Sequence, residues 1–396
     1  MAVSIKDRVA IIGMGCTKFG ERWDKSASDL LVEAVYDAIE DAGIEMKDIG
    51  AGWVGASYDS SAKTGMGLTA PLRFQGLPVT RVENACATGT DSFRNAAYAV
   101  AAGIYDIVIA TGVEKIKDMG FSGLAMGYFP GVSNTQAMLT APGAFAILAT
   151  RYFKKYGLSY EEGKRAIGAV SVKSHANGSL NPKAHFRNKI TLDKVLNAPI
   201  IAEPLGLFDC CGVSDGAAAA ILTRPEIAKN FRKDPVYVKA LQICCSSEYG
   251  RTDTEYDFTS FPEIYLAGQR AYEEAGIKNP REEISMAEVH DCFSITELVT
   301  MEDLQFSPRG RAREDIESGF FNIDGGLPVQ PDGGLKCFGH PVGATGIRMI
   351  YEMYLQLQGR AGDRQIENPR FGLTHNLGGQ PGGCTISVAI VGNDLG

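Results

Sequence analysis

Short apolar runs alternate with amphipathic stretches along the first part of the chain. Residues 9–13, 53–56 and 107–111 are continuous apolar runs, which are typical of strands buried on both faces. Residues 28–43 carry apolar side chains at spacings of three and four and end in Gly43, which predicts an amphipathic helix. This order of elements predicts an α/β protein with a largely parallel sheet covered by helices on both faces.

The second half of the chain repeats this pattern. Residues 38–44 are echoed by residues 271–277, and each segment leads through a short charged stretch to a predicted strand. The turn at Cys86, with a helix ending at Gly103, is likewise echoed by the turn at His340, with a helix ending at Gly359. A long repeat of this kind predicts two duplicated lobes whose matching turns face each other, which would pair Cys86 with His340.

Residues 114–209 do not fit the repeat and are interpreted as an inserted lid domain. They contain a turn-rich stretch at 127–131, a helix-like stretch at 143–156 and a polar run at 173–182. Long insertions in compact folds are usually functional. We therefore expect an N-terminal lobe of residues 1–113 plus 210–232, an inserted domain of residues 114–209 and a C-terminal lobe of residues 233–396.

The composition excludes several classes of protein. A length of 396 residues with 45% hydrophobic and 22% charged residues is typical of a globular protein, and the net charge of −8 argues against a nucleic-acid partner. The nine cysteines form no C-x-x-C pair, which argues against a disulfide framework or a zinc ribbon. The polar start and the absence of a run of about 18 apolar residues predict a cytoplasmic protein with no membrane contact.

Cys86 is the first candidate for chemistry. It lies among small residues, directly before the helix-like stretch 92–102. Unpaired N–H groups and the helix dipole at this position would lower the thiol pKa and make Cys86 a nucleophile. The alternative is a buried cysteine that serves only as a small apolar residue.

Three further stretches carry reactive groups. In residues 289–294, His290 and Cys292 lie two apart at a strand end, so their side chains point to the same side. In residues 337–346, His340 precedes a proline and two glycines, where backbone and ligand can approach closely. Residues 376–383 form a glycine-rich turn before the last predicted strand, which would aim free N–H groups at a carbonyl oxygen. With Cys86 these groups suffice for acyl transfer, and no metal site is expected.

A basic cluster lies in the inserted region. Lys173, Lys183 and Arg187, with Lys189, follow one another within seventeen positions. Such a cluster is either a solvated charged face or a site for the phosphates of a large acyl carrier.

The motifs resemble those of the thiolase superfamily, and specifically of the thiolases linked to sterol carrier protein x. The most specific motif is His-Asp-Cys-Phe at 290–293, where ordinary thiolases carry Asn-Glu-Ala-Phe; Gly-His-Pro at 339–341 is shared more widely. Ordinary thiolases also carry a second catalytic cysteine where this chain has Asn376, and the resemblance gives that acid/base role to Cys292.

The resemblance implies a fold, a reaction and ligands. The fold would be two duplicated α/β lobes in five αβαβα layers, with an inserted loop domain. His340 would take the proton of Cys86, whose sulfur attacks a 3-oxoacyl-CoA, and Cys292 would protonate the departing enolate and deprotonate coenzyme A. His290 and His340 would hold the enolate oxygen, and the N–H groups of Cys86 and Gly378 the oxyanion. Coenzyme A is then a substrate, and no bound cofactor is expected.

Substrate, partners and alternatives remain open at this point. The resemblance implies a homodimer or a dimer of dimers and allows a small partner protein with a zinc ribbon and an OB-fold. Aromatic residues of the inserted region favour a bulky acyl group, such as that of 2-benzoylsuccinyl-CoA: Phe121, Tyr128, Phe129 and Phe145. The alternatives are a carbon–carbon lyase of the retro-aldolase type, whose known members lack the nucleophilic cysteine, a decarboxylating condensing enzyme, and a non-catalytic acyl-CoA-binding subunit.

Overall fold

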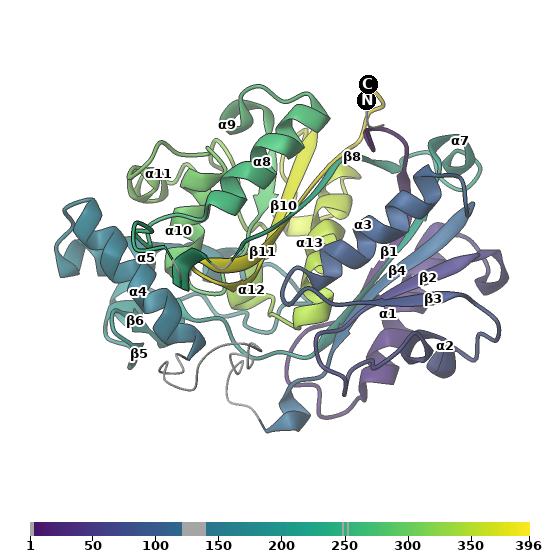
Figure 1. Cartoon of the computed structure of the whole chain (residues 1–396), viewed down its shortest axis with the longest axis horizontal. Coiled ribbons are helices and arrows are strands. Elements are labelled where there is room, and N and C mark those ends of the chain that lie inside the picture. Colours follow the sequence, from purple (N-terminus) through teal and green to yellow (C-terminus); the bar gives the residue numbers. More distant parts are fainter. Residues whose placement is uncertain (1–3, 121–139, 248, 252) are drawn as a thin grey trace.

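A computed structural model describes residues 4–120, 140–247, 249–251 and 253–396 of the chain. Within these residues, one mixed sheet of nine strands has the order β3-β2-β4-β7-β1-β8-β11-β10-β9 (Figure 1). The strands are β1 (Ala10–Cys16), β2 (Ala51–Gly55), β3 (Val79–Val82), β4 (Ile107–Glu114), β7 (Gly216–Thr223), β8 (Val236–Cys245), β9 (Met286–Glu288), β10 (Phe371–Gln380) and β11 (Gly383–Gly392). A separate pair is formed by β5 (Ile200–Ala202) and β6 (Leu205–Gly206).

Helices connect and cover these strands. The α-helices are α1 (Ala27–Ala42), α2 (Met66–Leu72), α3 (Thr88–Ala101), α4 (Ala141–Lys155), α5 (Tyr160–Gly178), α6 (Leu192–Leu196), α7 (Pro225–Ala228), α8 (Pro262–Ala275), α9 (Pro280–Glu283), α10 (Ser294–Asp303), α11 (Ala312–Glu317), α12 (Gly334–Cys337) and α13 (Val342–Leu357). Short 3-10 helices lie at Met46–Asp48, Lys117–Met119, Leu207–Asp209, Tyr249–Arg251 and Gly362–Arg364.

The expectation of a largely parallel sheet is wrong. Only β2 with β3, β2 with β4 and β9 with β10 run parallel, and the other neighbours in the described sheet are antiparallel. The last two strands form a hairpin, and a short hairpin connection makes its strands antiparallel. Buried apolar runs look the same in either orientation, so the pattern alone could not distinguish the two.

The helices and the two halves of the sheet form the five expected layers. The half containing β1 to β4 and β7 joins the half containing β8 to β11 through the pairs Ala10 with Tyr237 and Ile11 with Val236. Helices α3 and α13 pack on each other between the halves, and α13 contacts both β4 and β10. Helix α1 covers the outer side of the first half and α8 that of the second (Figure 1).

Glycines allow the two central helices to touch. A Cβ atom on Gly89 would lie 2.9 Å from the carbonyl oxygen of Gly343 and from the nitrogen of Gly346. A Cβ atom on Gly346 would lie 2.3 Å from the nitrogen of Thr90. The first turns of α3 and α13 are therefore in backbone contact, which brings the turns that precede them close together, as the repeat predicts.

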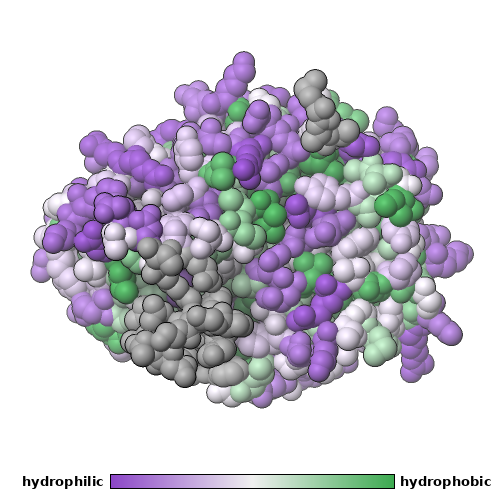
Figure 2. All heavy atoms as spheres, in the orientation of Figure 1, coloured by the Kyte–Doolittle hydropathy of each residue, from purple (hydrophilic) through white to green (hydrophobic). Residues whose placement is uncertain are grey.

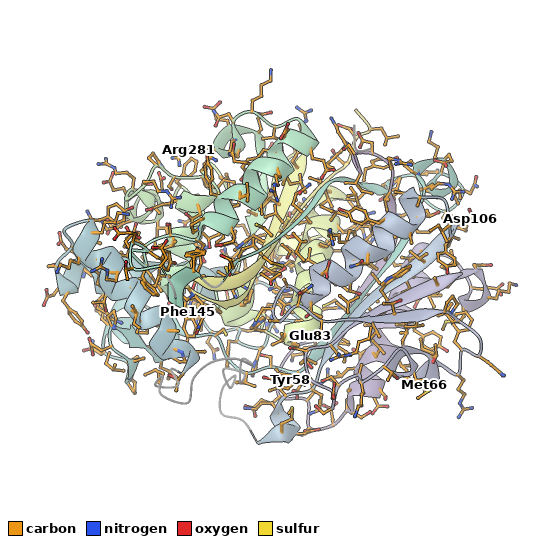
Figure 3. The ribbon with its side chains drawn as sticks, in the orientation of Figure 1. Tyr58, Met66, Glu83, Asp106, Phe145 and Arg281 are labelled. Atoms are coloured by element: carbon orange, nitrogen blue, oxygen red, sulfur yellow. The ribbon has the colours of Figure 1, made fainter. Side chains whose placement is uncertain are left out.

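Helices α4 and α5, which lie between β4 and β7 in the chain, pack against the second half of the molecule. Helix α5 begins with a capping box between Ser159 and Glu162 and contacts α10 and α12. Phe145 of α4 is buried, and its ring lies 4.8 Å from that of Phe293 (Figure 3). The other three aromatic residues expected to line a pocket, Phe121, Tyr128 and Phe129, lie outside the described residues.

The polar run at 173–182 is mostly helix and not an irregular loop. Helix α5 continues to Gly178, and Lys173, Ser174 and Asn177 are buried in it. The Asn177 amide donates to the carbonyl of Gln330 at 2.9 Å, so a buried partner replaces water.

The molecular surface is mixed. Polar residues cover most of the face seen in Figure 2, and apolar residues occur there in small scattered groups. Among the described residues, no helix is both long and apolar enough to cross a bilayer.

A substitution at Gly112 tests the contact between sheet and α13. A Cβ atom there would lie 2.1 Å from the carbonyl oxygen of Gly343, which is backbone and cannot rotate away. We expect Gly112→Ala to lower the free energy of unfolding by about 1–3 kcal/mol in chemical denaturation. Gly206→Ala is the matched control, because its φ is −94° and its nearest neighbour is 3.5 Å away. Equal stability of the two variants would contradict the assigned contact.

Candidate active site

Cys86 lies in a braced turn immediately before α3. Ala85 has φ +47°, a left-handed conformation that is uncommon for alanine and costs free energy. The Thr88 hydroxyl accepts from the Asn84 N–H at 2.8 Å and donates to the Ala85 carbonyl at 2.5 Å. These bonds close the turn and hold the Cys86 sulfur at the start of the helix.

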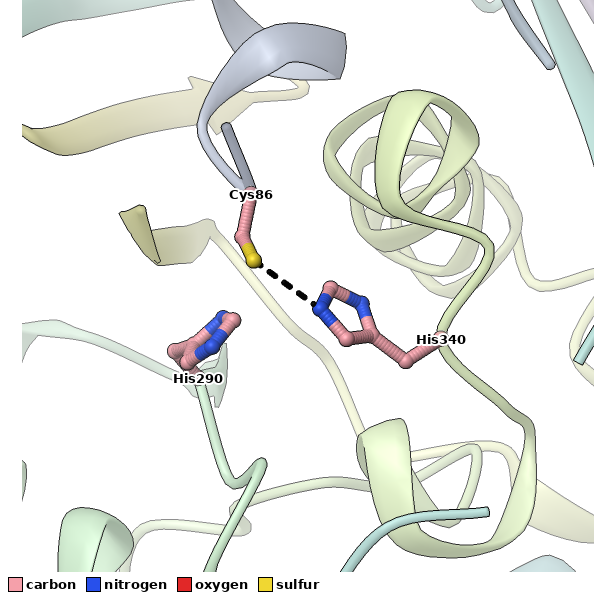
Figure 4. Close-up of side chains that lie close together, drawn as sticks. All are labelled: Cys86, His290 and His340. Atoms are coloured by element: carbon pink, nitrogen blue, oxygen red, sulfur yellow. Dashed lines mark hydrogen bonds between the residues drawn. The ribbon is translucent and has the colours of Figure 1, made fainter. Parts of the chain in front are cut away.

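His340 faces this sulfur from the matching turn before α13. Its Nε2 lies 3.1 Å from the Cys86 Sγ (Figure 4). Its Nδ1 lies 2.8 Å from the Thr345 hydroxyl, which donates its own proton to the Pro341 carbonyl at 2.9 Å. Because that hydroxyl proton is already used, Thr345 accepts the proton on Nδ1. Nε2 is therefore unprotonated and can accept the thiol proton of Cys86.

Burial keeps both members of this pair neutral. Burial, helped by the charge of Arg348, lowers the pKa of His340 to about 3. Burial also raises the pKa of the Cys86 thiol, and Cys211, Glu114 and Glu83 raise it further. The expectation that the helix start lowers this pKa is therefore wrong, because desolvation of the thiolate outweighs the helix dipole. Ionisation of Cys86 must be coupled to proton transfer to His340.

His290 completes a cluster of three reactive groups. Its ring is nearly perpendicular to that of His340, with centroids 5.2 Å apart. The Cys86 sulfur and one ring nitrogen of each histidine all lie within 4.8 Å of one another. Burial lowers the pKa of His290 well below its usual range, and its Nδ1 has no hydrogen-bond partner among the described residues. A buried imidazole of this kind can bind an oxygen of a ligand.

Cys292 lies near this cluster, close enough to interact with Cys86. It is buried, and its Sγ is 3.8 Å from the Thr296 hydroxyl. Burial raises its pKa well above the usual range, and the charges of Cys211 and Cys86 add to that increase. The N–H of Cys211 donates to the carbonyl of Cys292 at 2.9 Å, so a third thiol belongs to this region. Cys211 was not identified from the sequence. It directly follows Cys210 shortly before a buried strand, and these two adjacent cysteines could have indicated a reactive region.

Gly378 lies against the backbone of Cys86. It belongs to β10, so the predicted glycine-rich turn begins only after Gln380. A Cβ atom on Gly378 would lie 2.9 Å from the nitrogen of Cys86 and 2.6 Å from the carbonyl oxygen of Asn84. Only glycine fits there, and the backbones of the two residues expected to bind the oxyanion are adjacent.

Asn376 is held in place by its neighbours. Its Oδ1 accepts from the Thr90 hydroxyl at 2.8 Å, and its Nδ2 donates to the Met349 sulfur at 3.1 Å. An amide has no proton to exchange at neutral pH, so this position offers no acid or base.

Buried charges fix the segments that carry the histidines. Arg348 of α13 is fully buried and bonds to Glu288 at 2.7 Å and to Asp332 at 2.5 Å. Glu288 is the last residue of β9, two positions before His290, and Asp332 precedes α12. Arg348 therefore ties the helix that follows His340 to the strand that leads to His290. It lies eight positions after His340 and was not identified from the sequence.

Glu114 fixes the start of α13 in a similar way. Its carboxylate accepts from the backbone N–H groups of Ser57, Tyr58 and Gly343 at 2.9, 3.1 and 2.9 Å. It thus joins the end of β4 to the first turn of α13, directly behind the Cys86–His340 pair. Neither Glu114 nor Thr345 was identified from the sequence.

The predicted phosphate-binding cluster does not form. Lys173 is buried and pairs with Glu297 at 2.8 Å while donating to the Val329 carbonyl at 2.9 Å, so the prediction for this residue is wrong. The Lys183 ammonium is half-buried beside the Cys16 carbonyl and Asp37. Arg187 is exposed, and its role stays a prediction.

Comparisons with known proteins identify the family of the chain. Residues 9–226 match the model for the thiolase N-terminal domain, and residues 246–392 match that for a thiolase C-terminal domain-like region. The chain is 40% identical to the acetyl-CoA acetyltransferase of Methanothermobacter thermautotrophicus over 96% of this chain and 98% of that protein. It is 32% identical to sterol carrier protein 2 of Gallus gallus, covering 95% of this chain and 71% of that protein.

Two solved structures share the fold. An Ltp2-ChsH2(DUF35) aldolase matches with a TM-score of 0.83 and 26% identity over 99% of both chains. Human mitochondrial 3-ketoacyl-CoA thiolase matches with a TM-score of 0.71 and 16% identity over 99% of this chain and 100% of that one.

The chain belongs to the thiolase family. Its fold is the thiolase fold, and its relatives place it near the sterol carrier protein x type, which confirms the resemblance drawn from the motifs. It is an acyltransferase of the thiolase class.

The pH dependence of Cys86 alkylation tests the neutral pair. In His340→Asn, in which the base beside the sulfur is removed, burial keeps the Cys86 thiol protonated, so the rate with iodoacetamide should rise about tenfold per unit between about pH 6 and 9. The native chain, which can pass this proton to His340 Nε2, should react faster at pH 6 and depend less on pH. The rate is measured by mass spectrometry of the Cys86 peptide, with the exposed Cys245 as reagent control. Equal rates of the native chain and His340→Asn at pH 6 would contradict this account.

Removing Arg348 tests the role of the buried charges. We expect Arg348→Gln to lower the free energy of unfolding by about 3–5 kcal/mol, because Glu288 and Asp332 lose their buried partner. The control is Arg360→Gln, because the Arg360 side chain is 41% exposed and pairs with Asp41 at the surface. This variant should lower the free energy of unfolding by about 0–1 kcal/mol. Similar losses in denaturant titrations of the two variants would show that the Arg348 pairs contribute no more than a surface pair.

Proposed function

We propose that this thiolase cleaves, or forms by reverse Claisen condensation, a 3-oxoacyl-CoA through an acyl group carried on Cys86. The observation that carries the proposal is the hydrogen bond between the Cys86 sulfur and the unprotonated Nε2 of His340. A nucleophile in contact with its base, and a base oriented by a third group, is the arrangement that covalent catalysis requires.

The proton transfers follow from the arrangement. As the Cys86 sulfur attacks the ketone carbon, its proton passes to His340 Nε2, so that no buried thiolate stands alone. The N–H groups of Cys86 and Gly378 would bind the oxygen that becomes negative, since their backbones are adjacent. Cleavage of the carbon–carbon bond leaves an acyl group on sulfur and an enolate on the departing thioester.

Cys292, His290 and His340 would act on the enolate. The two imidazoles lie with ring centroids 5.2 Å apart, and the Nδ1 of His290, which has no partner among the described residues, would bind the enolate oxygen. Cys292, whose raised pKa keeps it protonated, would donate its proton to the enolate carbon and then remove the proton of incoming coenzyme A. Coenzyme A would therefore be a substrate.

The relatives support a short acyl group. The chain is 40% identical to two proteins named acetyl-CoA acetyltransferase, so acetoacetyl-CoA is the first substrate to test. A bulky substrate such as 2-benzoylsuccinyl-CoA is the second candidate from the motifs. Of the aromatic residues that favoured it, Phe145 packs in the core against Phe293 and Phe261, which weakens that argument.

A retro-aldolase is the main rival, because a solved aldolase shares the fold at 26% identity. Such a lyase cleaves without an acyl-enzyme intermediate, whereas this chain carries Cys86 in contact with a base. That same structure is named for two proteins together, Ltp2 and ChsH2(DUF35), which supports a partner protein here. The resemblance of the motifs makes a small protein with a zinc ribbon and an OB-fold the partner to test. We also propose that the protein forms a homodimer or a dimer of dimers. We propose a cytoplasmic location, because the nine cysteines are free, as is usual in a reducing compartment.

Intact-protein mass spectrometry tests the acyl-enzyme. After mixing with acetyl-CoA, acetoacetyl-CoA, longer 3-oxoacyl-CoA thioesters and 2-benzoylsuccinyl-CoA, the native chain should gain one acyl mass, which free coenzyme A removes. Cys86→Ala should gain none, and the matched control Cys245→Ala, at an exposed thiol, should load like the native chain. The thioester that loads fastest identifies the substrate class. Carbon–carbon cleavage without any adduct, with or without a partner protein, would favour the lyase.

A further inference from the structure

We propose that Cys86, His290 and His340 also form a binding site for a borderline divalent cation, Zn²⁺ above all, and that the bound ion inhibits the enzyme. From the sequence we expect no metal site, since the nine cysteines form no C-x-x-C pair. Among the described residues, theirs is the one group of three or more His, Cys, Asp and Glu side chains whose ligand atoms lie so close together. The proposal uses the same side chains as the proposed function but does not need acyl transfer to occur.

The geometry of the cluster is close to that of a zinc site. Tetrahedral Zn²⁺ has bonds of about 2.3 Å to sulfur and about 2.0–2.1 Å to nitrogen, which places neighbouring ligand atoms about 3.3–3.6 Å apart. Here the Cys86 sulfur and His340 Nε2 are 3.1 Å apart, and all three ligand atoms lie within 4.8 Å of one another. Shifts of about 1 Å or less would complete three bonds.

The surroundings of the cluster also suit a metal ion. His340 gives its other ring proton to Thr345, which is the outer contact that orients metal-binding histidines and leaves Nε2 as the ligand. His290 follows the end of β9 by two positions and has a buried ring nitrogen without a partner among the described residues.

Binding would remove the nucleophile from the reaction. The cation takes the electron pair of the Cys86 sulfur, and the thiol proton leaves to solvent, so one proton is released per ion bound. The fourth coordination position is the space that the substrate carbonyl would enter. An acyl group on Cys86 converts the thiol into a thioester, which is a poor ligand, and should exclude the metal.

The set of ligands predicts which ions bind. One thiolate and two imidazoles suit Zn²⁺ and Co²⁺, whereas Mg²⁺ and Ca²⁺ prefer oxygen ligands. Inhibition should therefore appear with Zn²⁺ and be absent with the same concentration of Mg²⁺.

Co²⁺ titration of the chelator-treated whole chain tests the site directly. We expect one equivalent to bind with a thiolate-to-cobalt charge-transfer band, and Zn²⁺ to displace it. Cys86→Ala should lose the band, and His290→Ala should weaken binding at least about tenfold. Thr345→Val should weaken it about 10–100-fold, while Cys245→Ala, at an exposed thiol, should bind like the native chain.

Protection experiments connect the metal to the nucleophile. Zn²⁺ should block iodoacetamide labelling of Cys86, EDTA should restore it, and prior acylation should prevent Co²⁺ binding. No charge-transfer band in the native chain, or an unchanged band in Cys86→Ala, would overturn the proposal. Failure of thioester loading in metal-free buffer would refute the proposed function and leave the cobalt result standing.

Discussion

The backbone contact between α3 and α13 is the constraint on which the site depends. Gly89 and Gly346 leave no room for side chains between the two helix starts, so the turns that precede them are held face to face. One turn carries Cys86 and the other His340, and their side chains meet at 3.1 Å. Cys86 and His340 could not come into contact if the two halves of the sheet were rotated or separated. Duplication of the fold therefore creates the reactive pair.

Burial then decides the chemistry of that pair. In an interior of low dielectric constant, a charged imidazole or an isolated thiolate is costly, so Cys86 and His340 rest as neutral groups. The formal charges nearby are carried by Arg348, Glu288 and Asp332, which pair with one another. The proton can therefore move within one hydrogen bond during attack, without reorganisation of the surrounding charges.

Much of this could be predicted from the sequence, but not all. The repeat and the motifs predicted the fold and the meeting of Cys86 with His340, because glycine-flanked turns repeat at matching places. The predicted parallel orientation of the strands was wrong, because a buried apolar run does not show in which direction its neighbour runs. The predicted phosphate contact of Lys173 was wrong, because the sequence does not show that this lysine is buried against Glu297. The predicted lowering of the Cys86 pKa was wrong, because the sequence shows the helix start but not the burial of the thiol.

Nitrogen-15 NMR of the His340 ring at neutral pH tests the central claim most directly, namely that a neutral imidazole accepts the thiol proton of Cys86. The chain has five histidines, so His340→Asn identifies the resonances. The account predicts a protonated Nδ1, bonded to Thr345, and an unprotonated Nε2. An imidazolium with both nitrogens protonated, or a proton on Nε2 alone, would contradict it.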